Sequence, residues 1–232
     1  MTEPTTTSPD GATDATATTT STDAPQSTLV CVVLDRSGSM QAIKSDVDGG
    51  FDAFITAQQA VGGECRVTLN QFDTEYERVL TLVPVADVPA LDLQPRGGTA
   101  LLDAIGRTVT DLQHDLDTRP PDEQPDQIVV VILTDGYENS SVEWTYPAVK
   151  QLVESKQPAW QFVFIGADQD AITEGAKLGV DAATSLMNRS SGPSTARSYA
   201  LLADKVVGVR RGVRVAFTDE ERAAAMADDE TP

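Results

Sequence analysis

Apolar runs alternate with amphipathic stretches along residues 28–210. Two runs, TLVCVVLD at 28–35 and QIVVVILT at 127–134, are almost continuously apolar and end in a polar residue. Such runs are typical of strands that are buried on both faces of a parallel sheet. Shorter apolar runs predict further strands over 65–72, 76–83 and 159–165.

Between these runs, apolar positions recur at helical spacing. In one stretch, for example, Val47, Phe51 and Phe54 fall on one side of a helix. The same spacing predicts helices over 41–60, 100–117, 145–156, 170–178 and 194–209. The stretch 84–98 is rich in Pro and Gly, so we expect a loop there.

The order of these elements predicts the fold class. Strands that alternate with helices imply right-handed crossovers, and therefore an α/β, Rossmann-like, doubly wound sheet that is mostly parallel with helices on both faces. The short turn at 73–75 instead predicts an antiparallel hairpin at one edge of the sheet, made of 65–72 and 76–83. In sheets of this class, ligands bind outside the carboxyl ends of the strands.

The two ends of the chain differ from this central part. Residues 1–27 are an acidic Thr/Ser-rich segment with almost no apolar side chains, so we expect a disordered tail. Residues 28–210 would form the domain, and 211–232 an acidic C-terminal tail. Within that tail, Thr218 and Glu221 have the spacing of a capping box, which could start a short helix.

Net charge excludes several kinds of partner. The chain carries 17 Lys and Arg against 36 Asp and Glu, a net charge of −19. Such a surface repels nucleic acid and anionic lipid, so we expect neither a nucleic-acid nor a membrane partner. The sequence shows no signal-peptide pattern and no apolar stretch long enough to span a bilayer, so we expect a cytoplasmic protein.

The two cysteines, Cys31 and Cys65, lie within or beside apolar runs. There, a cysteine usually acts as a small hydrophobic residue, so we expect two reduced core thiols. A disulfide stays open as the alternative if their strands are neighbours. Neither cysteine belongs to a CxxC pair, so the sequence shows no zinc or redox motif of this kind.

Three segments place oxygen-bearing side chains at predicted strand or helix ends. Asp35 ends the first apolar run and is followed by Ser37 and Ser39, which a turn at the intervening glycine can direct back toward it. Thr99 follows two glycines and stands directly before a helix, which its side chain can cap. Asp135 follows the second apolar run. These side chains should therefore meet at one edge of the sheet.

This donor set predicts a site for one hard divalent cation. Carboxylate and hydroxyl oxygens select Mg²⁺, Mn²⁺ or Ca²⁺. Few carboxylates with several hydroxyls favour Mg²⁺, which keeps bound waters. At most five protein groups leave one position open, and a carboxylate from a partner protein could fill it. Other side chains that follow strand ends could line the rim of this site: Asp73, Glu75, Tyr137, Glu138, Asp168 and Asp170.

The pattern Asp35-x-Ser37-x-Ser39, Thr99 and Asp135 resembles the metal-ion-dependent adhesion site (MIDAS) of von Willebrand factor A (VWA) domains, without a substitution. The resemblance covers roughly residues 28–210. The segments GGTALLDAIG (97–106), LTDGYENSS (133–141) and FVFIGADQDA (162–171) resemble small bacterial and phage proteins of this family. The resemblance to VWA domains implies the strand order 3-2-1-4-5-6 with strand 3 antiparallel. It also implies that the five residues hold the ion directly or through water, and that the domain binds proteins without being an enzyme.

Two alternatives remain. A Mg²⁺-dependent phosphotransferase or hydrolase could also use an acid at the end of a strand, but it needs a second carboxylate two residues later and a basic group for phosphate. Position 37 is a serine, and Lys44 is the only lysine nearby. The other alternative is a scaffold in which the metal is purely structural.

Overall fold

The computed structural model describes residues 1, 27–167 and 170–227. The tail predicted to be disordered falls almost entirely outside the described residues. Within them, one sheet contains the strands β1 (Thr28–Asp35), β2 (Cys65–Phe72), β3 (Tyr76–Pro84), β4 (Gln127–Thr134), β5 (Trp160–Ala167) and β6 (Ser185–Asn188). Their order is β3-β2-β1-β4-β5-β6, and only β3 pairs in the antiparallel sense. The predicted fold class, strand order and edge hairpin are confirmed.

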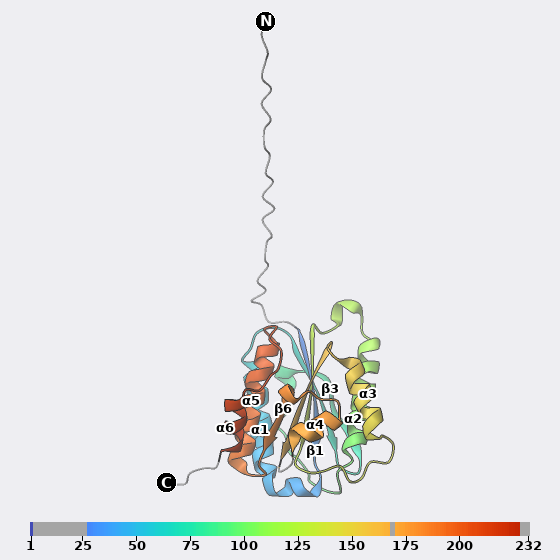
Figure 1. The fold of residues 1–232 in the computed structure, drawn as a ribbon, viewed down its shortest axis with the longest axis vertical. Helices are drawn as coiled ribbons and strands as arrows, with labels where there is room; N and C mark the ends of the chain where they lie inside the picture. The colour runs from blue at the N-terminus through green and yellow to red at the C-terminus, as the bar shows by residue number, and fades with distance from the viewer. Residues whose placement is uncertain (2–26, 168–169, 228–232) are drawn as a thin grey trace.

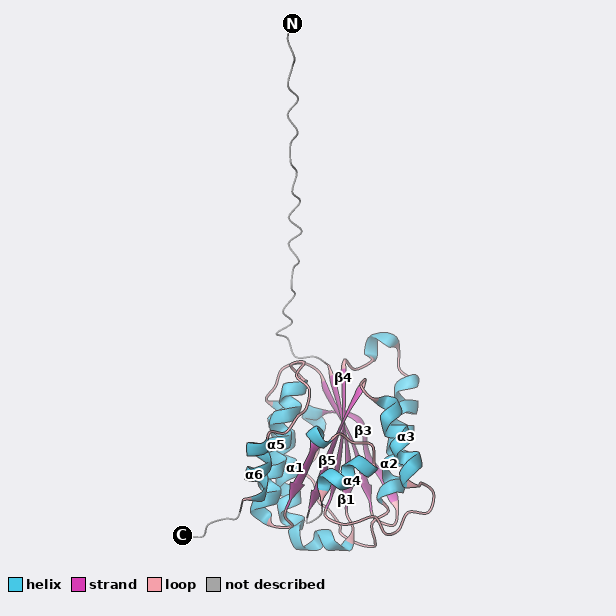
Figure 2. Cartoon of the chain, viewed as in Figure 1, coloured by secondary structure: helices cyan, strands magenta, loops and turns pink. Residues whose placement is uncertain are grey.

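The helices cover both faces of the sheet. They are α1 (Lys44–Gln59), α2 (Leu101–Asp117), α3 (Tyr146–Lys156), α4 (Ala171–Lys177), α5 (Gly192–Val209) and α6 (Asp219–Met226). Short 3₁₀ turns are η1 (Gly38–Ile43), η2 (Val85–Asp87), η3 (Pro121–Glu123) and η4 (Ala182–Thr184). In Figure 1, α1, α5 and α6 lie on one side of the sheet and α2 and α3 on the other, and Figure 2 shows the strands as the layer between them.

Alternation along the central strands explains this layered arrangement. In β1, Val30, Val32 and Leu34 face the core beneath α1 and α5, whereas Cys31 and Val33 face the core beneath α2 and α3. Both faces of the strand are therefore buried, which its continuous apolar run predicted. No helix in the described part of the chain is long and apolar enough to cross a bilayer.

The cysteines lie on opposite faces of the sheet. Cys31 belongs to the core beneath α2, and Cys65 to the core beneath α1. Although β1 and β2 are neighbours, Cys65 pairs in register with Thr28 rather than with Cys31. Both thiols are free and buried, so the expectation of reduced core thiols is confirmed and the disulfide is excluded.

The packed structure continues beyond residue 210, where we expected the domain to end. Val215 and Phe217 are buried in the core beneath α5, and Ala225 in α6 is fully buried. The capping box predicted for the short helix is present, because the Thr218 hydroxyl accepts from the Glu221 amide and the Glu221 carboxylate accepts from the Thr218 amide. Residues 211–226 therefore contribute to the core as well as to the acidic surface.

Candidate metal centre

Three loops meet at the carboxyl edge of the sheet, as the sequence predicted. The loop after β1 is joined to the segment before α2, because the Gly38 amide donates to the Gly97 carbonyl at 3.2 Å. That segment is joined in turn to the loop after β4. The Asn139 amide donates to the Thr99 carbonyl at 3.0 Å, and the Asn139 side-chain oxygen accepts from the Thr99 amide at 2.9 Å. The backbone thus fixes the three motif segments against one another.

The predicted ligands face one another within this frame. The hydroxyls of Ser37 and Ser39 lie 3.1 Å apart, and Ser39 Oγ donates to Asp135 Oδ1 at 2.7 Å. The Asp35 carboxylate accepts from the Ser37 amide at 2.6 Å. These contacts connect the serines with both carboxylates, so four of the five predicted residues form one cluster.

Thr99 completes the cluster across Gly136. A Cβ atom built on Gly136 would lie 3.3 Å from Thr99 Oγ1 and 3.7 Å from Ser39 Oγ. Both hydroxyls therefore face the backbone of this glycine from opposite loops. A side chain at position 136 would press against the hydroxyls that we expect to bind the ion.

Asp35 is a buried carboxylate without a cationic partner. Its side chain is fully buried and is bonded only by neutral groups: the Ser37 amide, the Thr134 hydroxyl at 2.6 Å and the Ser37 side chain. In the described part of the chain, no basic side chain forms an ion pair with it. Burial, with a smaller contribution from the negative charge of Asp135, raises the pKa of Asp35 to about 6. A cation bound here would supply the missing positive charge.

The donor chemistry fits a hard cation. Carboxylate and hydroxyl oxygens are the ligands of Mg²⁺, Mn²⁺ and Ca²⁺. Among the described residues, no group of three or more His, Cys, Asp or Glu side chains could hold a metal. An ion at this edge would therefore depend on the three hydroxyls as well as on the two carboxylates.

The expected capping role of Thr99 is wrong. Helix α2 begins at Leu101, and no side-chain cap is made by its N-cap residue. The carboxylate of Glu138 accepts from the Leu102 amide at 2.9 Å, and the Ser141 hydroxyl accepts from the Asp103 amide at 3.1 Å. Glu138, a predicted rim residue, thus caps α2 from the loop after β4.

Arginines neutralise the acids on the β2–β3 side of the site. Asp73 is buried and receives hydrogen bonds from Arg36 Nε at 2.8 Å and Arg96 Nε at 2.9 Å. Arg96 also pairs with Glu75 at 2.8 Å. Burial would raise the pKa of Asp73, but the bonds from Arg96, the Glu75 amide and Arg36 outweigh it and lower the pKa.

Both arginines stand next to motif residues in the sequence, which is a signal that could have identified them. Arg36 lies inside the Asp-x-Ser-x-Ser motif, and Arg96 directly precedes Gly97. Although Arg96 is 56% exposed, its guanidinium is already paired with Asp73 and Glu75, so these arginines compensate the acids of the rim.

The remaining rim candidates have different roles. Tyr137 is 59% exposed beside Asp135, whereas Asp170 caps α4 by accepting from the Thr173 amide at 3.1 Å. Asp168 lies outside the described residues. Trp144 packs against the α2 core, and Trp160 is buried, so both are packing residues.

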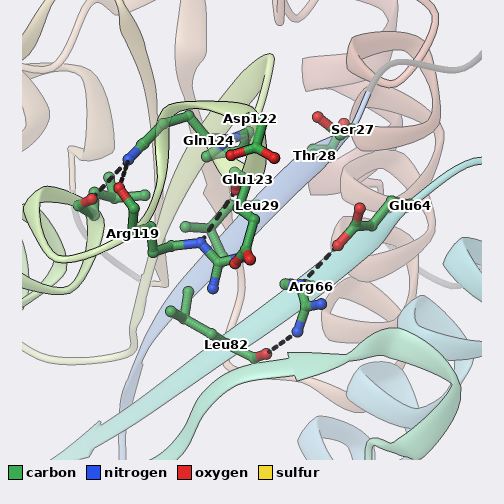
Figure 3. A pocket seen from close by; sticks show the side chains of 12 residues that line it. Ser27, Thr28, Leu29, Glu64, Arg66, Leu82, Arg119, Asp122, Glu123 and Gln124 are labelled. Atoms are coloured by element: carbon green, nitrogen blue, oxygen red, sulfur yellow. Dashed lines mark hydrogen bonds and ion pairs between the residues drawn. The ribbon is translucent and has the colours of Figure 1, made fainter.

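A cavity lies at the amino ends of β1 and β2, away from the three loops of the candidate metal centre. It has a volume of about 130 Å³. Two ion pairs lie among the side chains drawn in Figure 3: Arg66 bonds Glu64 at 2.7 Å, and Arg119 lies 3.1 Å from the Glu123 carboxylate.

The fold has relatives among solved structures, although no family model and no curated protein matches the sequence. Proximal thread matrix protein 1 from the mussel byssus, with a zinc-occupied MIDAS motif, is 16% identical, with a TM-score of 0.57 over 82% of this chain and 47% of that chain. A von Willebrand factor type A protein from Catenulispora acidiphila is 16% identical, with a TM-score of 0.55 over 79% and 43%.

The vWF domain of the type V pili tip protein Mfa5 from Porphyromonas gingivalis is 11% identical, with a TM-score of 0.55 over 84% of this chain and 99% of that domain. By contrast, the chain spans about half the length of the mussel protein. The strand order and these similarities agree, and the chain has the fold of a von Willebrand factor type A domain.

Proposed function

We propose that this chain is a metal-dependent protein-binding module rather than an enzyme. One divalent cation, Mg²⁺ in preference to Mn²⁺ or Ca²⁺, would coordinate an Asp or Glu carboxylate of a partner protein. The residues that would hold the ion are Asp35, Ser37, Ser39, Thr99 and Asp135.

The observation that carries this proposal is the uncompensated charge of Asp35. A buried carboxylate that has only neutral donors is costly to keep ionised. Here it lies beside a second carboxylate and a row of hydroxyls that face one another. A divalent cation would compensate both charges, and the zinc-occupied MIDAS motif of the mussel protein supports such an ion in this fold.

The expected coordination leaves room for a partner. Mg²⁺ requires octahedral geometry, and five protein groups cannot fill six positions. A carboxylate is a strong oxygen donor for the remaining position. Arg36 and Arg96 reduce the repulsion that a carboxylate would meet at this rim, because they pair with Asp73 and Glu75. The phosphotransferase alternative lacks its second acid, because Ser37 occupies that position.

A displayed library of random peptides tests the proposal directly. Peptides are bound to the immobilised chain in Mg²⁺ and eluted with EDTA. We expect the eluted peptides to be enriched in Asp or Glu. Recovery of the same peptides when EDTA is present throughout, or enrichment without acidic residues, would contradict a carboxylate bound through the ion.

Replacing Thr99 with alanine should separate metal binding from partner binding. The loss of one neutral hydroxyl should lower Mg²⁺ affinity less than the loss of Asp35 or Asp135, but it should disturb the open position. We expect calorimetry to show residual Mg²⁺ binding, while binding of a selected acidic peptide falls at least about tenfold, the order expected for losing one contact in a metal site. Thr110→Ala, at an exposed position of α2, is the matched control. Equal peptide binding by both variants would refute the assignment of Thr99.

A further inference from the structure

Thr134 is the last residue of β4, and Asp35 is the last residue of the neighbouring strand β1. The register pairs Leu34 with Leu133, which makes Thr134 the cross-strand neighbour of Asp35. Thr134 is 5% exposed, so its hydroxyl depends on protein partners. This threonine is not among the five residues of the metal motif.

The direction of the Thr134 hydroxyl follows from its surroundings. Its oxygen lies 2.6 Å from Asp35 Oδ2, 3.1 Å from the Gly136 carbonyl and 3.2 Å from the Gly136 amide nitrogen. A hydroxyl has one proton to donate, and a carboxylate is the stronger acceptor. Thr134 therefore donates to Asp35 and accepts from the Gly136 amide.

The Asp35 carboxylate is consequently held from two sides. Oδ1 accepts from the Ser37 amide and Oδ2 accepts from Thr134, and the Ser37 side chain also bonds the carboxylate. Bonds at both oxygens fix the plane of the carboxylate. Through Gly136, the same hydroxyl connects Asp35 to the loop that carries Asp135.

We propose that Thr134 is a positioning residue of the metal centre, which orients Asp35 for the ion without binding the ion itself. This inference rests on the proposed metal-dependent function. Without the hydroxyl, Asp35 would lose the bond that holds Oδ2. Metal binding would then have to restrict a more mobile carboxylate, which lowers the affinity for the ion. Removal of partners that orient metal ligands usually lowers affinity by about 10- to 100-fold.

Calorimetric titration of the full chain with Mn²⁺ tests this role in Thr134→Val and Thr134→Ser. Valine keeps the shape without the hydroxyl, and we expect its Mn²⁺ affinity to fall by about 10- to 100-fold. Serine keeps the donor and should restore affinity to within about threefold of the unaltered chain. Thr108→Val is the control, because Thr108 is a buried threonine that bonds Asn70 and Tyr76 in the α2 core. It should lower stability and leave Mn²⁺ affinity unchanged.

The outcomes separate this inference from the proposed function. Equal Mn²⁺ affinity of Thr134→Val and the unaltered chain would overturn the role of Thr134 while leaving the metal site in place. No Mn²⁺ binding by the unaltered chain would overturn both. If Thr134→Val does not fold, Thr134→Ala serves instead, and the same fall with rescue by serine is expected.

Discussion

Replacing Asp35 with asparagine should abolish Mg²⁺ binding and, at the same time, stabilise the chain in EDTA. Both effects have one cause. The fully buried Asp35 carboxylate receives only neutral donors, so its charge is costly until a cation compensates it. Asparagine keeps the shape and removes the charge. Its Oδ1 still accepts from the Ser37 amide, and its Nδ2 donates to the Thr134 hydroxyl, which then donates to the Gly136 carbonyl. A residue selected for folding alone would show the opposite effect on stability.

The pKa of Asp35 gives the size and sign of this effect. Burial raises it from 3.8 to about 6, which corresponds to a penalty of about 3 kcal/mol when the group is ionised. Because the folded pKa lies above the unfolded pKa, the penalty is complete above pH 6 and disappears below about 3.8. The stability advantage of Asp35→Asn in EDTA should therefore be largest at pH 7 and smaller at pH 5.

Urea denaturation in EDTA at these two pH values measures the difference, and calorimetry measures the loss of Mg²⁺ binding. Asp122→Asn, at an exposed position in η3, is the matched control and should change neither quantity. An Asp35→Asn chain that is less stable than the unaltered chain at both pH values would show that the carboxylate is needed for folding and not for an ion.

Replacing Arg210 with methionine should destabilise the fold more than any change at the metal centre. Arg210 is fully buried at the end of α5. Its guanidinium donates to the Gln58 carbonyl at 2.5 Å and to the carbonyls of Val61, Gly62 and Gly63 at 3.1 Å each. These carbonyls belong to the last turn of α1 and to the first residues of its connection to β2. One side chain therefore donates to carbonyls that the end of the helix leaves without helical partners.

Methionine would remove the guanidinium from all four carbonyls, of which Gln58 would still accept from the Val61 amide, and we expect a loss of about 4 kcal/mol in the free energy of unfolding. Urea denaturation checks this value. Arg210→Lys keeps the charge but cannot reach all four carbonyls, so its loss should be smaller. Mg²⁺ affinity should change in neither variant, because these carbonyls precede the amino end of β2, opposite the metal centre. A loss below about 1 kcal/mol in Arg210→Met would refute this role.

The sequence predicted most of the fold because the central strands are buried on both faces. Continuous apolar runs such as 28–35 and 127–134 mark such strands without ambiguity. Strand β6, Ser185–Asn188, was missed because four residues carry too little periodicity to distinguish a strand from a loop. The helix predicted over 41–60 is α1, Lys44–Gln59, and residues 41–43 belong instead to the 3₁₀ turn η1.

The position of the candidate metal centre at the carboxyl edge of the sheet could also be predicted from the apolar runs. Asp35 and Asp135 are recognisable because each stands at the end of an apolar run, and adjacent parallel strands bring their carboxyl ends together. Their supporting contacts could not be predicted in this way. The capping of α2 by Glu138, the pairing of Arg96 with Asp73 and the bond from Thr134 to Asp35 all join residues that are distant in sequence, and no periodicity records them.

The most direct test of the metal centre is anomalous diffraction from crystals of the chain grown with Mn²⁺. We predict one anomalous peak at the carboxyl edge of the sheet, between the hydroxyls of Ser37, Ser39 and Thr99 and the carboxylates of Asp35 and Asp135. At least some of these oxygens should lie within about 2.0–2.3 Å of it, close to the Mg²⁺ bond length. No peak between these residues at saturating Mn²⁺, or a single peak elsewhere on the chain, would contradict the account.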